Sequence, residues 1–239
     1  KLHGDASNRI YYRTTLDGKS VIIMQLPEGA SSISEEISKS PPPAELPFLN
    51  VQRTLEQQRL PVAKVMHNFG RILVLEDLGD VTLEKELQQH PTEQLHWYQK
   101  AIDLLVRVQD LKTTGACIAF QRSFDATLFN WEFDHFLEYG IEARQGIKID
   151  PKDLKVIKQG MNFITFGLTK LPQLFVHRDF QSRNLMIQGG ELKLIDFQDA
   201  LLGPSVYDLV ALLRDSYITL PWALVEQVIG YYLKNVRAP

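Results

Sequence analysis

The chain has 239 residues, of which 44% are apolar and 23% charged, with a net charge of −3 at pH 7. That length is enough for one large domain or a two-lobed one, and the small charge without a long basic run excludes nucleic acid or an anionic membrane as expected partners. Cys117 is the only cysteine, no apolar run reaches about 18 residues, and no signal peptide opens the chain. We therefore expect a soluble, cytoplasmic protein.

The N-terminal residues predict a β-hairpin preceded by a tight loop. Strands are expected at residues 10–14 and 20–25, with a turn at Asp17-Gly18. Arg13 lies in the first strand. The loop before it consists of small and polar residues whose backbone N–H groups could approach phosphate closely. These residues are Gly4, Asp5, Ala6, Ser7, Asn8 and Arg9. An ordinary surface turn is the alternative, and Arg9 or Arg13 could add positive charge.

The next stretch combines a loop, a helix and two more strands. Residues 27–47 are rich in Ser and Pro and predict a mobile loop, which a lid over a nucleotide would require. A helix is expected to begin at Pro47, followed by strands at 62–66 and 71–75. The segment that then ends the sheet is typical of an adenine-binding hinge, and equally of a plain strand-to-helix link. It comprises Leu75, Glu76, Asp77 and Leu78.

From Thr82 onward the chain is expected to be mainly helical, with helices within 92–112 and after Asp150-Pro151. Residues 125–139 are crowded with aromatic and acidic side chains. Most of the rings are expected in the core, but a wall that binds sugar would use the same residue types. Glu132 and Asp134 are therefore candidate substrate contacts.

Two polar clusters flank a predicted short hairpin near the C-terminus. Residues 177–184 form a polar loop, and strands at 185–187 and 192–195 turn at Gly189-Gly190. The second strand delivers Asp196, so the two clusters reach the same end of one hairpin. We expect a functional site there.

Phosphoryl transfer is the chemistry that these clusters suit. Asp179 is the candidate base for the attacking hydroxyl, and Asn184 and Asp196 are oxygen donors of the kind that Mg²⁺ accepts. Further on, a turn is expected at Gly203-Pro204, and Asp208 lies at the start of the apolar helix that follows it. It could cap its own helix or accept N–H bonds from the catalytic loop, and we favour the second arrangement.

The order H-R-D-x-x-x-x-N, hairpin and D-F resembles the catalytic core of kinases. Asp-Phe-Gln in place of Asp-Phe-Gly, with no Ala-Pro-Glu following, fits protein kinases less well and is similar to the aminoglycoside phosphotransferase and choline kinase branch. Four stretches resemble the bacterial anomeric sugar kinases within that branch: GDASNRIYYR, LEDLGD, VHRDFQSRNLM and IDFQDALLGPSVYDLVALLRDSY. Those enzymes use ATP to phosphorylate N-acetylmuramate and N-acetylglucosamine at the anomeric hydroxyl.

The resemblance implies an α+β, bilobal protein-kinase-like fold. Residues 1–77 would form a β-rich N-lobe that binds nucleotide, and residues 78–239 a helical C-lobe with the catalytic loop and acceptor site. The similar enzymes usually continue beyond Arg237, so we expect a C-terminal portion to be missing. A monomer is compatible with these features, and the oligomeric state stays open.

The resemblance also implies roles for individual residues. Asp179 would be the base, Asn184 and Asp196 the Mg²⁺ ligands, 4–9 the phosphate loop and 75–78 the adenine hinge. Apart from the resemblance, we expect three residues to support the catalytic loop: His177, Arg178 and Asp208. We expect four residues to contact the acceptor: Glu132, Asp134, Arg183 and Asp199. The phosphate-binding strand Lys of this fold is absent, because the strand reads Val21-Ile22-Ile23-Met24, with Lys19 before it. Arg9 or Arg13 is expected to replace it.

Two alternatives to the sugar kinase remain. The acceptor could be an aminoglycoside, a choline-like amine or another small alcohol, although a cationic acceptor favours a more acidic cleft than a net charge of −3 suggests. The chain could also be a nucleotide-binding pseudokinase, which the absent strand Lys motivates. Against that hypothesis, Asp179, Asn184 and Asp196 are all present.

Overall fold

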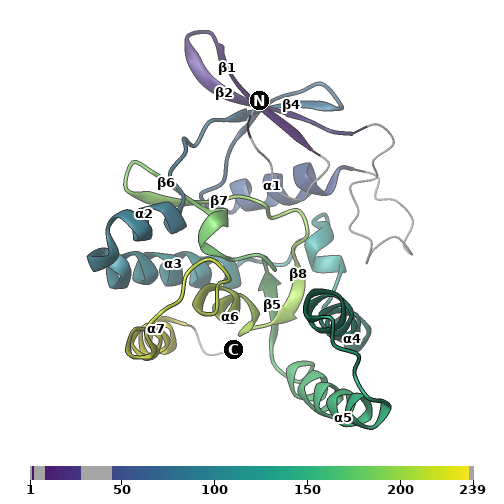
Figure 1. Cartoon of the computed structure of the whole chain (residues 1–239). Coiled ribbons are helices and arrows are strands. Elements are labelled where there is room, and N and C mark those ends of the chain that lie inside the picture. The colour runs from purple at the N-terminus through teal and green to yellow at the C-terminus, as the bar shows by residue number, and fades with distance from the viewer. Residues whose placement is uncertain (1, 3–8, 28–44, 237–239) are drawn as a thin grey trace.

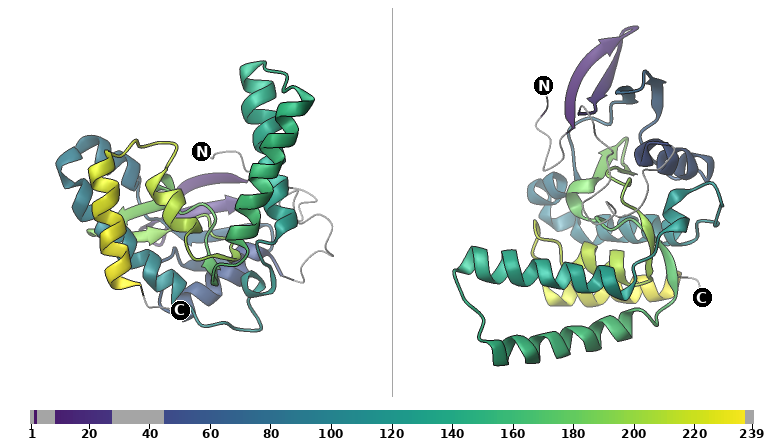
Figure 2. Two further views of the ribbon diagram at one scale, coloured as in Figure 1. Left: turned by 90° about the horizontal axis from the view of Figure 1, so that it is seen from below. Right: turned by 90° about the vertical axis from the view of Figure 1, so that its right-hand side faces the viewer.

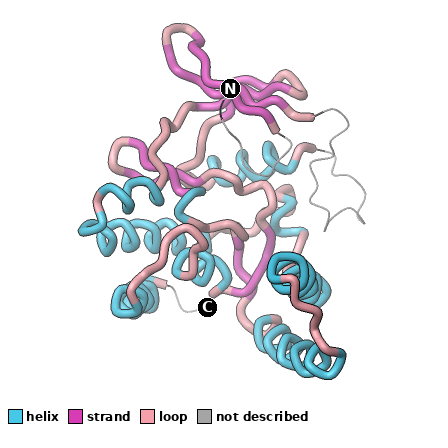
Figure 3. The backbone as a smooth tube through the Cα atoms, in the orientation of Figure 1, coloured by secondary structure: helices cyan, strands magenta, loops and turns pink. Residues whose placement is uncertain are grey.

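The computed structural model describes residue 2 and residues 9–27 and 45–236. In this part of the chain an antiparallel sheet comes first and a mainly helical region follows, so the predicted α+β class is confirmed (Figure 1). The sheet strands gather at the top of Figure 3 and the helices lie below them. The predicted phosphate loop at 4–8 and most of the predicted mobile loop lie outside the described residues.

The first sheet has four strands in the order β1-β2-β4-β3. The strands are β1 (Ile10–Leu16), β2 (Lys19–Gln25), β3 (Val65–Asn68) and β4 (Ile72–Glu76). The predicted turn joins β1 to β2 with positive φ angles at Asp17 and Gly18, as a two-residue hairpin requires. This sheet therefore forms largely where the sequence pattern predicts.

Helix α1 (Pro47–Gln57) covers the inner face of this sheet. It begins at the predicted Pro47, and Val51 and Leu55 are fully buried in one core cluster with Met24 of β2. Phe48 stacks on Phe197 with ring centroids 5.2 Å apart. Because Phe197 follows Asp196, this contact joins α1 to the polar cluster after the hairpin.

The remaining helices form the lower part of the molecule. They are α2 (Leu83–Gln89), α3 (Gln94–Gln109), α4 (Ala126–His135), α5 (Pro151–Leu168), α6 (Tyr207–Leu213) and α7 (Trp222–Asn235), with short 3-10 turns η2 (Pro91–Glu93), η3 (Ile118–Gln121) and η5 (Ser182–Asn184) and a π-helix η4 (Phe136–Ala143). Helix α3 is the centre of the core, because Tyr98, Ile102 and Leu105 recur at helical spacing and are fully buried. No helix among the described residues is both long and apolar enough to cross a membrane.

Helices α4 and α5 form an arm that projects from the body (Figure 2). The predicted cap at Asp150 is confirmed, because its carboxylate accepts the N–H of Lys152 at 2.8 Å. Lys158 of α5 pairs with Asp134 of α4 at 3.2 Å, and Thr165 lies 3.4 Å from Asn130. These contacts hold the two helices side by side.

Two small strand pairs carry the polar clusters. The predicted hairpin is confirmed as β6 (Leu185–Gln188) and β7 (Glu191–Leu194), with positive φ at Gly189 and Gly190. Strand β5 (Gln173–Val176) leads into the loop at 177–184 and pairs with β8 (Leu201–Pro204). We expected a turn at Gly203-Pro204, and that expectation is wrong. A Cβ on Gly203 would lie 3.0 Å from the side chain of Val176, so glycine here permits close pairing of the strands.

The core centred on α3 predicts a large stability difference between two leucines. Leu105→Ala should lower the free energy of unfolding by about 2–5 kcal/mol, because it leaves a cavity in a fully buried site. Leu233→Ala in α7 is the matched control, since Leu233 is 67% exposed. Urea denaturation measures both. Equal losses would contradict the packing described here.

Candidate active site

A buried carboxylate shapes the start of the loop between β5 and β6. Asp208 is 1% exposed, and its two oxygens accept the backbone N–H groups of His177 at 2.7 Å and Arg178 at 3.0 Å. Of the two arrangements considered for Asp208, the structure has the second. Arg178 has a φ of 78°, which non-glycine residues rarely adopt. Burial raises the pKa of Asp208 to about 7, while the two N–H bonds act in the opposite direction.

His177 ties this loop to the end of β7. Burial lowers its pKa to about 4, so the ring is neutral at pH 7. Its Nδ1 lies 3.2 Å from the N–H of Asp179 and must accept that proton, which leaves Nε2–H to donate to the carbonyl of Ile195 at 2.9 Å. The His177 ring therefore sets the separation between Asp179 and Asp196, which directly follows Ile195.

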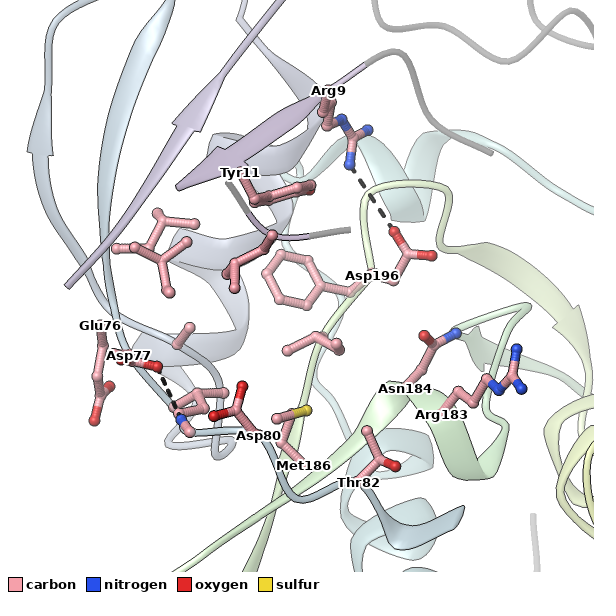
Figure 4. Close-up of a pocket in the computed structure, with 18 of the residues that line it drawn as sticks. Arg9, Tyr11, Glu76, Asp77, Asp80, Thr82, Arg183, Asn184, Met186 and Asp196 are labelled. Atoms are coloured by element: carbon pink, nitrogen blue, oxygen red, sulfur yellow. Dashed lines mark hydrogen bonds and ion pairs between the residues drawn. The ribbon is translucent and has the colours of Figure 1, made fainter. Parts of the chain in front are cut away.

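Asp179 and Asn184 face the second polar cluster. Desolvation and, next to it, the negative charge of Asp196 together raise the pKa of Asp179 to about 6. The amide nitrogen of Asn184 donates to the carbonyl of Asp179 at 2.9 Å. This bond leaves the amide oxygen of Asn184 on the side of Asp196 (Figure 4). A weakly acidic carboxyl and two oxygen donors thus lie around one space.

Asp196 itself is held in an unusual backbone conformation. Its φ is 65°, and Gln198 Nε2 donates to both its carboxylate at 2.9 Å and that of Asp199 at 3.0 Å. Its side chain is 44% exposed, toward the cavity. Left-handed backbone at a non-glycine residue is costly and often marks a functional position.

The side chains at this site supply only part of a coordination shell for Mg²⁺, which is usual for that ion. Asn184 and Asp196 supply hard oxygen donors, and Mg²⁺ commonly binds one or two protein groups together with phosphates and water. Within the described ranges, no cluster of three or more His, Cys, Asp or Glu side chains could enclose a metal ion. The protein therefore offers an incomplete shell that a nucleotide's phosphates would complete.

A cavity of about 640 Å³ opens at these residues and extends to β4. Its apolar end includes Ile22, Ala63 and Met186, and the predicted hinge residues also line it: Leu75, Glu76, Asp77 and Leu78. Such a volume suits a nucleotide-sized ligand. Aliphatic walls at one end and oxygen donors at the other suit a base joined to phosphates.

The two arginines expected near phosphate lie in different surroundings. Arg13 contacts Asp77 at 2.7 Å, Asp80 at 2.7 Å and the carbonyl of Gly79 at 3.0 Å, and the two carboxylates raise its pKa. It therefore ties β1 to the hinge, away from Asp196. Arg9 instead lies 3.9 Å from Asp196, with a side chain only 10% exposed (Figure 4).

Three of the predicted acceptor contacts lie in three different places. Glu132 pairs with Arg178 at 2.9 Å, and Arg183 bonds Glu84 at 2.8 and 3.1 Å and lines the cavity. Asp134 instead pairs with Lys158 in a separate small hollow between α4 and α5. The structure thus brings Arg183 to the cavity and Glu132 to the catalytic loop, and keeps Asp134 apart from both.

Sequence reasoning missed three residues near the loop: Glu84, Asp215 and Tyr217. Arg183 lies over the ring of Tyr217, 3.7 Å from its centroid, and Asp215 accepts the N–H of Ser182 at 2.7 Å. The only local signal was a polar Asp-Ser-Tyr directly after an apolar helix. Their partners lie 33 to 99 residues away in sequence, so no short pattern marks them.

Solved structures share this architecture. An ADP-bound aminoglycoside phosphotransferase, APH(2'')-Ib, superposes with a TM-score of 0.63 at 17% identity, covering 96% of this chain and 78% of that one. Choline kinase LicA from Streptococcus pneumoniae gives 0.62 at 17% identity, covering 96% and 73%. The chain therefore has the protein-kinase-like fold, as the sequence predicted.

The profile of the phosphotransferase enzyme family matches residues 1–239, and the chain belongs to that family. A relative from Neisseria meningitidis serogroup B, named N-acetylmuramate/N-acetylglucosamine kinase, is 32% identical over 240 residues, which are 98% of this chain and 66% of that protein. A Pseudomonas aeruginosa protein of the same name is 27% identical over 235 residues, 97% and 64%. The chain thus spans slightly less than two thirds of these relatives.

The raised pKa of Asp179 predicts a pH-dependent stability. The folded state keeps a proton on Asp179 up to about pH 6, whereas the unfolded chain releases it near 3.8, so stability falls as pH rises through this window. Wild type should lose roughly 2 kcal/mol relative to Asp179→Asn between pH 4 and pH 8. Urea titrations at both pH values measure the difference.

The exposed Asp153 of α5 provides the control for that titration. Asp153→Asn should follow the wild-type curve, because this carboxyl lies at the surface of the first turn of α5. Parallel pH profiles for wild type and Asp179→Asn would show that Asp179 is not held in a buried, negatively charged surrounding.

Proposed function

We propose that the chain is an ATP-dependent kinase that phosphorylates the anomeric hydroxyl of N-acetylmuramate and N-acetylglucosamine. The observation that carries the proposal is the cavity-lining, weakly acidic Asp179 beside the oxygen donors Asn184 and Asp196. The names of the relatives, at 27% to 32% identity, support this acceptor class. The reaction would take place in the cytoplasm, where ATP is present.

The proposed chemistry assigns the proton to Asp179. The acceptor oxygen forms a bond to the γ-phosphorus as the bond to the β,γ-bridging oxygen breaks, ADP leaves, and the hydroxyl proton passes to the Asp179 carboxylate. A pKa of about 6 keeps this group ionised at pH 7 and basic enough to take the proton. An anomeric hydroxyl is more acidic than an ordinary alcohol, which lowers the demand on the base.

Asn184 and Asp196 would hold Mg²⁺, which when bound neutralises charge on the nucleotide phosphates. A cation there would also relieve the repulsion between Asp196 and Asp179, which helps to raise the pKa of Asp179 in the metal-free protein. The two side chains flank the two strands at the open end of one hairpin, so the fold supplies their spacing before any ligand binds.

Arg9 is the residue that we assign to the phosphates in place of the strand Lys. The inner face of β2 offers apolar side chains to this region. Ile22 lines the cavity, and Met24 on the same face is fully buried in the core. Arg13 is committed to Asp77 and Asp80. Arg9 lines the cavity and approaches Asp196, where the phosphates would lie.

Residues 1–77 and 78–239 would act as two lobes, with the cavity between them. The cavity is lined both by Ile22 and Leu75 of the sheet and by Asp179 and Asn184 of the loop, which supports that division. The described hinge residue Asp77 links the two parts. Its side chain bonds Arg13 of β1 and its carbonyl accepts Gln188 Nε2 of β6 at 3.1 Å.

³¹P NMR with Mg·ATP and each amino sugar tests the reaction. Wild type should yield a sugar 1-phosphate, and Asp179→Asn should lower the rate by about 10²–10⁴-fold, because it removes the base. Asp153→Asn, at an exposed position, should leave the rate unchanged. Phosphate on another hydroxyl would exclude the anomeric position. ATP binding without turnover on any acceptor would favour the pseudokinase hypothesis.

Nucleotide binding tests the role of Arg9 without any acceptor. Arg9→Met should weaken ADP binding by about tenfold or more, since a charged hydrogen bond is worth about 1.5–3 kcal/mol, and should leave adenosine binding unchanged. Calorimetry measures both ligands. Lys155→Met, on the exposed face of α5, is the control for loss of one positive charge. An equal loss for ADP and adenosine would contradict a contact with phosphate.

A further inference from the structure

Helix α6 presents a carboxylate to the catalytic loop at each of its ends. Asp208 lies in its first turn and bonds the N–H groups of His177 and Arg178. Asp215 lies two residues after its last residue, Leu213, and bonds the N–H of Ser182 at 2.7 Å. The loop at 177–184 is therefore held at its beginning and near its end by one short helix.

The carboxylate of Asp215 is buried, and both its oxygens have partners. Asp215 is 7% exposed, with Oδ2 accepting from Ser182 and Oδ1 accepting the N–H of Tyr217 at 2.8 Å. Ser182 is itself fully buried. Because Ser182 and Asp215 are both buried, water has little access to replace the carboxylate at the Ser182 N–H, and loss of this acceptor would leave the turn free to shift.

The turn held by Asp215 also sets the distance between the proposed base and a proposed metal ligand. The N–H of Gln181 donates to the carbonyl of Asp179 at 2.8 Å, and the N–H of Asn184 donates to the carbonyl of Gln181 at 2.9 Å. Ser182 lies inside this tight turn. A shift of Ser182 would therefore move Asn184 relative to Asp179.

The same carboxylate fixes one wall of the cavity. Tyr217, whose N–H it binds, lies under the guanidinium of Arg183, 3.7 Å from the ring centroid. Both side chains line the cavity that contains Asp179, and Arg183 stands beside Asn184 in Figure 4. Glu84 of α2 holds the other side of the guanidinium at 2.8 Å.

We propose that Asp215 is a positioning residue that fixes the second half of the catalytic loop and the Arg183–Tyr217 wall as one unit. The inference rests on the proposed kinase function. Asp215 does not line the cavity, so it acts through Ser182 and Tyr217. It should therefore govern the rate of phosphoryl transfer and not the affinity for ATP, whose apolar end lies at the hinge.

A double-mutant cycle tests the proposal. Asp215→Asn weakens the acceptor, and Ser182→Pro removes the donor. The extended backbone of Gln181, with φ −112° and ψ 163°, suits a following proline at the first position of η5. Each single variant should lower kcat by about 10²-fold and leave the KM for ATP unchanged. The kcat of the double variant should be no lower than that of the less active single variant.

Asp153→Asn is the control for loss of one carboxylate, because Asp153 lies on the exposed surface of α5 and its removal should retain the wild-type kcat. Additive losses, a KM for ATP that rises as kcat falls, or a lower Tm with kcat retained would each overturn the proposal.

Amide hydrogen exchange measured by NMR gives a second readout that needs no acceptor. The Ser182 amide should exchange slowly in the wild type and at least tenfold faster in Asp215→Asn. Fast exchange in the wild type would overturn the proposal. If neither amino sugar is phosphorylated, the proposed function fails, while the exchange result still decides whether Asp215 holds the loop.

Discussion

The two N–H bonds that Asp208 accepts in the core are the contacts on which the rest of the site depends. They let the chain leave β5, pass through a left-handed residue at Arg178 and still satisfy its backbone. With that start fixed, His177 can reach the carbonyl of Ile195 and set the separation between Asp179 and Asp196. Burying a carboxylate costs free energy. Here the two N–H bonds offset that cost, and they order a loop that has no regular secondary structure.

The site also depends on an unbalanced charge. Asp179 and Asp196 line one end of the cavity, and the negative charges of Asp196 and Asp199 contribute to the raised pKa of Asp179. Arg9 is the cation that approaches Asp196 within the described ranges. A phosphate-bound metal ion would supply the missing positive charge, so nucleotide binding and correct ionisation of the base would be linked. We propose that the same arrangement lets this chain bind nucleotide phosphates without a Lys in strand β2.

The parts of this site that the sequence predicted are those in which cause and effect are close along the chain. The hairpin followed from Gly189-Gly190, and the convergence of Asp179 with Asp196 followed from the hairpin. The clamp of Arg13 on Asp77 and the bond from Asp215 to Ser182 were not predicted, because each joins residues that only the folded chain brings together. A predicted turn became β8 for a similar reason, since its pairing with β5 outweighs the local preference of Gly-Pro.

Anomalous diffraction from crystals grown with Mn²⁺ and a non-hydrolysable ATP analogue would test the central claim most directly, namely that one hairpin assembles the base and the metal ligands. The account predicts a manganese peak bound by the side-chain oxygens of Asn184 and Asp196, with the terminal phosphate facing Asp179. A peak at other side chains, or a nucleotide whose phosphates point away from the loop at 177–184, would contradict it.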